Sequence, residues 1–198
     1  ALAGRDLLAS AETGSGKTTT LATMLSILND SSRKILTIED PVEYQIEGIN
    51  QSQIKPAIGL TFATALRAFL RHDPDVIMVG EVRDSETAHI AIHAALSGHL
   101  VLTTLHTETA ASAIPRLLEL GVEAFLLAST LRGVIAQRLV RVLCDRCKRT
   151  RQLETETLAA DPRYGSLGFR VGEEIYEPKG CERCGGTGYR GRNGGFEI

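Results

Sequence analysis

Short apolar runs alternate with longer amphipathic segments over roughly the first 140 residues of the chain. Residues 76–79 carry no polar side chain, which is typical of a strand buried on both faces. Short apolar runs also occupy residues 7–9 and 100–102, and residues 34–38 are rich in residues that favour strands. Segments between these runs predict helices, so this part of the sequence indicates an α/β domain with a largely parallel sheet.

Three of the intervening segments predict helices. The first covers residues 17–28. The second covers about residues 61–71 and ends before Asp73 and Pro74, because the residue before a proline avoids the α region. The third begins at Ser85, whose hydroxyl can cap a helix, and continues to Gly98.

The chain changes character after this region. Residues 152–179 are polar, charged and rich in turn-forming positions, and they separate two pairs of cysteines, Cys144 with Cys147 and Cys181 with Cys184. We expect this stretch to be a small insertion or an irregular module tied by the cysteines. The predicted division is a core at residues 1–143 and a C-terminal subdomain at 144–198.

Composition limits the partners of the chain. The 22 Lys and Arg residues against 24 Asp and Glu give a net charge of -2, so no global charge attracts nucleic acid or an anionic membrane. Aromatic residues make up 5% of the 198 residues and Trp is absent, which disfavours stacking on bases. No signal peptide opens the chain, and no apolar run approaches the roughly 20 residues of a membrane span. Because the sequence starts at Ala1 and stops abruptly at Ile198, we expect it to be part of a longer protein.

The most specific motif lies at residues 11–18, between a predicted strand and a predicted helix. In a phosphate-binding loop, glycines let backbone N–H groups point at phosphate oxygens, a lysine faces the β- and γ-phosphates, and a hydroxyl binds Mg²⁺. The alternative is a glycine-rich turn with a chance Gly-Lys-Thr. Ala11 stands where glycine is usual, and Glu12 places a carboxylate near the phosphates. The candidate nucleotide-binding residues are Thr13, Gly14, Ser15, Gly16, Lys17, Thr18 and Thr19.

Acidic residues follow two of the predicted strands. Glu39 and Glu43 come after the strand at 34–38, where a carboxylate can orient or deprotonate an attacking water. Without a neighbouring phosphate loop, this segment would be an ordinary acidic loop. Glu81 follows the strand at 76–79, with Gly80 where many ATPases carry Asp. Its expected role is to hold Mg²⁺ through water, although an apolar run ending in Glu is by itself a weak signal.

Arginines and histidines complete the candidate site. Arg67 and Arg71 are four residues apart on one predicted helix, and Arg83 follows the strand acid. Such arginines can stabilise phosphoryl charge, often from a neighbouring subunit, or form salt bridges with nearby acids. The sequence leaves both alternatives open. His99 and His106 flank the strand at 100–102. The sequence is compatible with a structural role for them as much as with a role in the site.

The cysteine spacing is compatible with two disulfides or with one metal site. A C-x-x-C turn presents two thiolates together, and tetrahedral zinc needs four. Glycines after Cys184 allow a tight turn, and nothing indicates export to an oxidising compartment. We therefore predict a structural Zn²⁺ held by Cys144, Cys147, Cys181 and Cys184.

Four ordered segments, GSGKTTTL, ILTIEDPVEY, ALRAFLRHDPDVIMVGEVRD and GHLVLTTLHT, resemble the type II secretion and type IV pilus assembly ATPases. Residues 129–147 continue the resemblance, which covers nearly the whole chain. It implies a RecA-like P-loop NTPase core, followed by a small zinc-binding C-terminal subdomain. The implied cofactors are ATP, Mg²⁺ and Zn²⁺.

The resemblance also implies roles for the candidate residues. Lys17 and Thr18 would bind MgATP. Glu43 would be the catalytic carboxylate of the segment called the Asp box, with Glu39 as its rival. Glu81 would be the Walker B acid, and the absence of Asp at position 80 is usual in the family. The residues implied to sense or approach phosphate are the His-box residues His106 and His99 and the arginines Arg67, Arg71 and Arg83.

At the level of the whole protein, the resemblance implies a cytoplasmic homo-hexamer at the inner membrane face. It would associate peripherally, through inner-membrane platform proteins of a secretion or pilus system, and would not act on nucleic acid. Retraction-type relatives lack the cysteine pairs, so the cysteines favour assembly of a pseudopilus for type II secretion. The alternatives are a type IV pilus extension ATPase, or a hydrolysis-impaired regulatory subunit, which Glu12 would explain.

Overall fold

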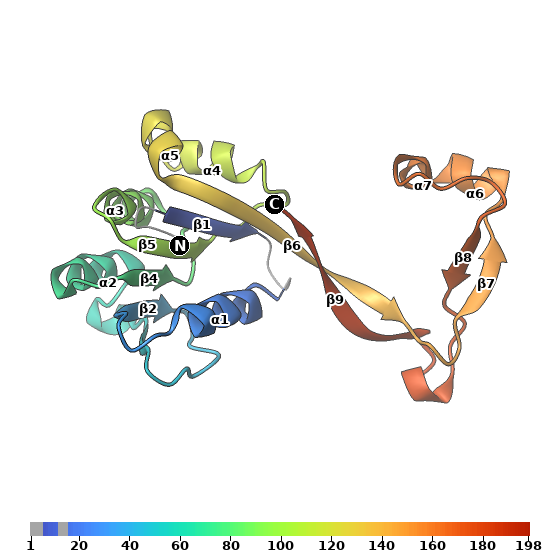
Figure 1. Cartoon of the computed structure of the whole chain (residues 1–198), viewed down its shortest axis with the longest axis horizontal. Helices are drawn as coiled ribbons and strands as arrows, with labels where there is room; N and C mark the ends of the chain where they lie inside the picture. The colour runs from blue at the N-terminus through green and yellow to red at the C-terminus, as the bar shows by residue number, and fades with distance from the viewer. Residues whose placement is uncertain (1–5, 12–15) are drawn as a thin grey trace. The chain divides into compact units, whose positions relative to one another are not determined.

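The computed structural model describes residues 6–11 and 16–198 (Figure 1). The chain divides into two compact units, Ala1–Arg138 with Gly194–Ile198 and Leu139–Asn193. Strands β6 (Leu131–Leu143) and β9 (Tyr189–Glu197) run from one unit into the other. The predicted division into a core at residues 1–143 and a subdomain at 144–198 stays a prediction.

The first unit is built on a seven-stranded sheet with the strand order β3-β2-β4-β5-β1-β6-β9. Its other strands are β1 (Asp6–Ala11), β2 (Ile35–Glu39), β3 (Asn50–Gln53), β4 (Val76–Val79) and β5 (Leu100–Thr104). Every pairing from β3 through β6 is parallel. The α/β fold with a largely parallel sheet is therefore confirmed.

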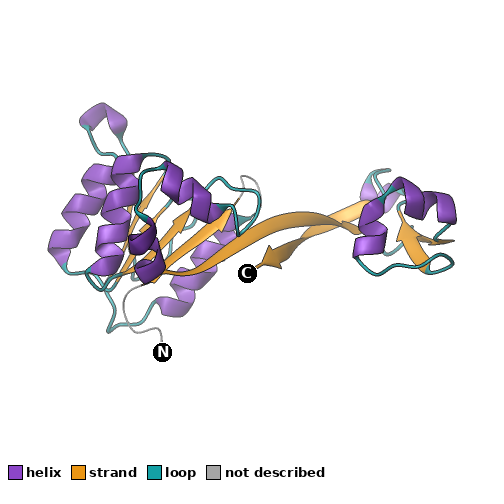
Figure 2. Ribbon diagram, turned by 90° about the horizontal axis from the view of Figure 1, so that it is seen from above, coloured by secondary structure: helices purple, strands orange, loops and turns teal. Residues whose placement is uncertain are grey.

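Helices cover both faces of this sheet (Figure 2). On one face, Leu25 of α1 (Lys17–Leu28) belongs to a buried cluster with Val76 and Met78. On the other, Ile77 and Val79 pack in a larger cluster with α2 (Phe62–Phe69) and α3 (Ser85–Leu96). The alternate residues of β4 thus face opposite helical layers, which explains why this strand has no polar residue.

Two helix ends differ from the sequence prediction. The second helix stops at Phe69 and continues as the 3₁₀ turn η2 (Leu70–His72), after which Asp73 adopts a left-handed conformation at φ 50°. The N-cap of α3 is Asp84, not Ser85, because the Asp84 carboxylate accepts a 2.8 Å hydrogen bond from the Thr87 N–H. An ionised carboxylate there also interacts favourably with the helix dipole.

Several elements have no counterpart in the sequence prediction. In the first unit these include β3, η1 (Pro56–Ile58), α4 (Ala113–Glu119), α5 (Ala124–Thr130) and β6. In the second unit they are β7 (Arg149–Gln152), α6 (Thr155–Ala160), α7 (Pro162–Ser166), β8 (Glu174–Glu177) and η3 (Glu182–Cys184). β7 and β8 form an antiparallel pair with α6 and α7 between them, so the expected irregular stretch contains ordered elements. None of the helices in the described part of the chain has both the length and the apolarity that a membrane crossing requires.

Candidate functional site

The predicted chemistry gathers at one edge of the sheet. Because β1, β2, β4 and β5 are parallel, their carboxyl ends lie at the same edge, where α/β folds bind ligands. Lys17 comes from the segment after β1 and Glu43 from the loop after β2. Glu81 follows β4, and His106 follows β5. Residues up to 89 positions apart in the sequence therefore share one edge of the fold.

The start of α1 has the features of an anion site. Gly16 adopts φ 82° at the N-cap, a conformation that glycine tolerates, and no side chain among the described residues caps the helix. The first-turn N–H groups of such a helix are available to an anion. The Lys17 amino group donates a 3.4 Å hydrogen bond to the Leu105 carbonyl, which links this turn to the end of β5. Thr13, Gly14, Ser15 and the departure at Glu12 lie outside the described residues.

Glu81 is held from two sides. Its carboxylate is 11% exposed, with Oε1 2.6 Å from Arg83 Nη2 and Oε2 2.9 Å from His106 Nε2. Because a carboxylate only accepts hydrogen bonds, the His106 ring donates from Nε2 in this contact. Arg83 thus makes the salt bridge that the sequence left as an alternative to phosphate contact.

A close approach between strands explains the glycine before this acid. A Cβ atom on Gly80 would lie 3.3 Å from Glu39 Cα and 3.3 Å from the Ile38 carbonyl oxygen. The Gly80 backbone donates to the Ile38 carbonyl at 2.8 Å and accepts from Thr104 Oγ1 at 2.7 Å. An Asp at this position would have to displace the end of β2, so the site has one acid here.

The two carboxylates of the Asp box have different surroundings. Glu39 is buried, and its Oε1 accepts hydrogen bonds from Thr37 Oγ1 at 2.6 Å and Gln51 Nε2 at 3.0 Å. Glu43 is exposed in the loop after β2, and no hydrogen bond or ion pair joins its side chain to the rest of the described chain. Glu39 is therefore a fixed anchor, while Glu43 is the carboxylate that remains available to solvent.

The other two arginines do not join this cluster. Arg67 pairs with Glu86 at 2.6 Å between α2 and α3, where both side chains are more than half exposed. Such a pair stabilises a protein by about 0–1 kcal/mol. Arg71 lies in η2, just before β4 begins, and is exposed. The expectation that both lie on one α-helix is wrong, because α2 ends at Phe69 and Arg71 lies in the 3₁₀ turn that follows.

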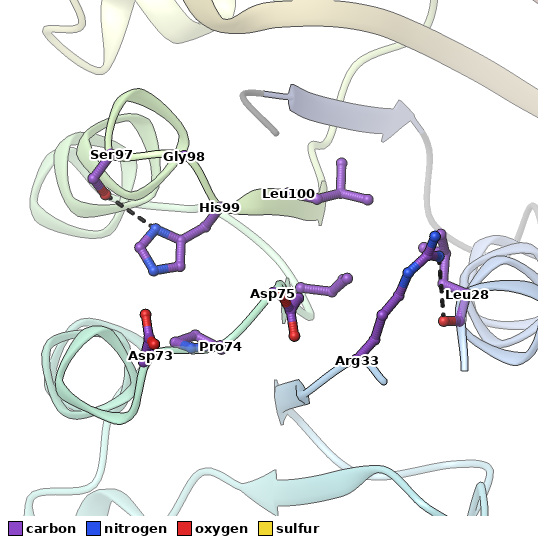
Figure 3. A pocket seen from close by; sticks show the side chains of 10 residues that line it. Leu28, Arg33, Asp73, Pro74, Asp75, Ser97, Gly98, His99 and Leu100 are labelled. Atoms are coloured by element: carbon purple, nitrogen blue, oxygen red, sulfur yellow. Dashed lines mark hydrogen bonds between the residues drawn. The ribbon is translucent and has the colours of Figure 1, made fainter. Parts of the chain in front are cut away.

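His99 lies at the opposite edge of the sheet from His106. It precedes β5, and its Nδ1 is 2.9 Å from the Ala94 carbonyl and 3.0 Å from Ser97 Oγ, contacts that close the end of α3. Figure 3 shows it beside a cavity of about 430 Å³, with Asp73, Asp75 and Arg33 around it. This cavity faces the amino ends of β4 and β5, so it is separate from the candidate site.

Some residues of the site were not predicted from the sequence. Gln51 contacts Glu39, and the Tyr44 hydroxyl lies 3.3 Å from Thr19 Oγ1 in the first turn of α1. Thr20 Oγ1 donates a 2.6 Å hydrogen bond to Gln137 Oε1 of β6. These contacts depend on which strands are neighbours, and no local motif in the sequence signals them.

The second unit brings all four cysteines together. Their sulfurs lie within 4.8 Å of one another. The distances are 3.9 Å between Cys144 and Cys181, 3.8 Å between Cys147 and Cys184, and 3.7 Å between Cys181 and Cys184. Tetrahedral Zn–S bonds of about 2.3 Å place sulfurs about 3.8 Å apart, so the cluster fits a zinc ion. A disulfide needs about 2.05 Å, and all four thiols are free.

The protein environment shifts the pKa values of Cys147 and Cys184 in opposite directions. Burial raises the pKa of Cys147 to about 11. Burial also acts to raise the pKa of Cys184, but hydrogen bonds from the N–H groups of Cys181 and Gly188, each at 3.2 Å, bring it down to about 6. Backbone N–H groups aimed at sulfur favour the thiolate that a metal requires.

A parallel sheet with a glycine-lysine turn opening a helix, and with acids at the same edge, defines a P-loop nucleotide-binding fold. The chain belongs to the type II/IV secretion system protein family, whose sequence model matches residues 4–198. Both findings confirm the predicted fold class and the family resemblance.

Several proteins in this family are similar to the chain. The type II secretion system protein E of Pseudomonas aeruginosa is 52% identical over 195 residues, which are 97% of this chain and 38% of that protein. The type IV pilus assembly ATPase PilB of Thermus thermophilus is 55% identical over 187 residues, 94% of this chain and 21% of that protein. The crystal structure of the pilus retraction motor PilT with bound ADP superposes with a TM-score of 0.64 at 42% identity, covering 70% of this chain and 43% of that one. The chain thus spans well under half the length of these relatives.

Proposed function

We propose that the protein hydrolyses MgATP and works as an oligomeric motor for assembly of a pseudopilus in type II secretion. The observation that carries this proposal is the meeting of Lys17, Glu81 and the Asp-box loop at one sheet edge. The name of a relative in Vibrio cholerae, type II secretion system ATPase E, at 51% identity, supports the same activity.

In this proposal each group has a distinct task. Lys17 and the first-turn N–H groups of α1 would hold the phosphates. The Thr18 hydroxyl would be a ligand of Mg²⁺. Glu81, oriented by Arg83 and His106, holds the metal's water shell. Glu43 accepts a proton from the attacking water, since its carboxylate has no hydrogen bond or ion pair with the residues that the structure describes. When bound, MgATP supplies the phosphoryl group and the charge that these residues stabilise.

The four-cysteine cluster is proposed to hold a structural Zn²⁺. All four ligand positions are filled by thiols, so no open position remains for a substrate or a reactive water. The ion would therefore stabilise the second unit without taking part in hydrolysis. Its ligands come from two ends of that unit, before β7 and after β8, so the ion would tie those ends together.

The working form is proposed to be a cytoplasmic homo-hexamer at the inner membrane face, bound peripherally through membrane platform proteins. The secretion-system names of the relatives support this setting. The net charge of -2 is consistent with the absence of nucleic acid among its partners. Arg67 and Arg71 are exposed. In the hexamer they would approach the phosphates of a bound nucleotide across a contact between subunits.

Pilus extension is a second candidate function. The identity to the Thermus pilus ATPase, 55%, is close to the 52% identity to the Pseudomonas secretion protein, so identity does not separate the two branches. A hydrolysis-impaired regulatory subunit is a third, and Glu12 beside the phosphate loop is the residue that would favour it.

The assignment of the base predicts unequal losses from the two Asp-box carboxylates. Glu43→Gln should lower kcat for ATP hydrolysis by about 10²–10⁴, because it removes the proton acceptor. Glu39→Gln should cost less, because the amide keeps an oxygen that accepts from Thr37 and Gln51. Steady-state turnover of the two full-length variants measures this difference. Equal losses would leave Glu43 without support as the base.

A further inference from the structure

Gln51 occupies the position where the Asp-box loop meets the sheet. It lies in β3, directly opposite Thr37 of β2 in the parallel register. Its Nε2 donates to the Tyr44 carbonyl at 2.8 Å and to Glu39 Oε1 at 3.0 Å, and its Oε1 accepts from the Ile46 N–H at 2.7 Å. A carboxamide has two N–H donors, so both are in use.

These three bonds connect the loop after β2 to the buried acid at the end of β2. Two of them fix the main chain at Tyr44 and Ile46, immediately after Glu43 in the loop. The third fixes the buried Glu39 carboxylate. The Tyr44 side chain contacts Thr19 at 3.3 Å, so the same loop also reaches the first turn of α1. The Gln51 side chain thus links the loop after Glu43 to the buried Glu39 carboxylate, and through Tyr44 to the first turn of α1.

We propose that Gln51 is a positioning residue for ATP hydrolysis: it holds the loop that carries Glu43 in register with α1. This inference rests on the hydrolytic function proposed above. Gln51 acts through Glu39 and Tyr44, so it contributes to the rate and little to nucleotide binding. A displacement of about 1 Å in a catalytic group can cost about 10²-fold in rate.

Gln51→Glu tests this role with a nearly isosteric change. The ionised carboxylate introduced by this substitution cannot donate to the Tyr44 carbonyl, and it faces the Glu39 carboxylate. In the full-length protein, kcat should fall by about 10–100-fold, with KM for ATP within about threefold. Two carboxylates in one site raise the pKa of one of them, and the protonated form can again donate. The ratio of variant to wild-type kcat should therefore rise as the pH is lowered from about 8 to about 6.

Gln53→Glu is the matched control, since it adds the same charge two residues along the same strand. Its side chain is exposed, and its Oε1 accepts a 3.4 Å hydrogen bond from the Val42 N–H, just before Glu43, a contact that a carboxylate retains. This variant should keep kcat within about twofold, since exposed substitutions of this kind have small effects. Gln51→Met, which fills similar volume without hydrogen bonds, should lose kcat without recovering at low pH.

The outcomes separate the two proposals. A wild-type protein without MgATP turnover would overturn the hydrolytic function, and the role of Gln51 with it. An active wild type with unchanged kcat in Gln51→Glu and Gln51→Met would overturn only the positioning role. The positioning role would also be overturned if kcat fell as far in Gln53→Glu as in Gln51→Glu. It would likewise be overturned if Gln51→Glu changed KM for ATP and left kcat unchanged. If Gln51→Glu does not fold, the kcat of Gln51→Met tests the positioning role. ATP binding by Gln51→Met then shows that this variant is folded.

Discussion

Glu81→Gln is expected to bind ATP within a few-fold of the wild type and to lower kcat by about 10²–10⁴. The carboxylate is 11% exposed and is held by Arg83 at 2.6 Å and His106 at 2.9 Å. An amide of the same shape keeps the fold of this edge but removes the negative charge that would face the metal. It also places an N–H₂ group opposite one of two donors, so one of the two contacts is lost.

Equilibrium binding of a fluorescent ATP analogue and steady-state turnover, measured on one preparation, distinguish these effects. Glu119→Gln is a suitable control, because Glu119 makes an exposed pair with Arg116 at 3.2 Å on α4. That variant should lose little, since exposed pairs contribute about 0–1 kcal/mol. Unchanged turnover in Glu81→Gln would show that Glu81 takes no part in hydrolysis. Loss of ATP binding would show that its role is structural.

Cys181→Ser is expected to release the metal and destabilise the second unit while leaving ATP binding intact. Zinc binding in small cysteine-based domains contributes about 10–16 kcal/mol at neutral pH, and a missing thiolate removes much of it. Cys181 lies in contact with two other sulfurs, at 3.7 and 3.9 Å, so its loss opens the cluster. The nucleotide residues all lie in the first unit, which has its own core.

Zinc content by atomic emission, limited proteolysis of residues 139–193 and ATP binding are the three readouts. Glu182→Gln, an exposed change beside the same cysteine, should retain one zinc per chain. Retention of zinc by Cys181→Ser would contradict the four-cysteine site. Loss of ATP binding would show that the two units form one cooperative structure.

The strands and helices nearest the nucleotide edge could be predicted because their residues face two apolar layers. Residues 76–79 are all buried, and the first helix was predicted with both ends correct. The carboxyl ends of parallel strands meet at one edge, so Lys17, Glu81 and His106, each of which follows such a strand, lie at that edge. The local sequence was sufficient to predict a single strand or helix and the functional residue that directly follows it.

The remainder depends on contacts between distant segments. The pairing in the sheet of β6 with β9, whose first residues are 58 positions apart, follows no local pattern. Gln51 acquires its role only because the register sets it opposite Thr37. Arg71 was assigned to the second helix, but a 3₁₀ turn replaces the last part of that helix before Asp73.

The most direct test of the account is MgATP binding and turnover by the full-length protein beside its Lys17→Ala and Glu12→Pro variants. Lys17 supplies the charge at the start of α1, so its loss should abolish measurable turnover and weaken ATP binding strongly. Glu12→Pro should change turnover little, and omission of Mg²⁺ should stop it. Turnover that survives Lys17→Ala would contradict the proposed site. ATP binding without turnover, restored by Glu12→Pro, would identify a regulatory subunit in place of a motor.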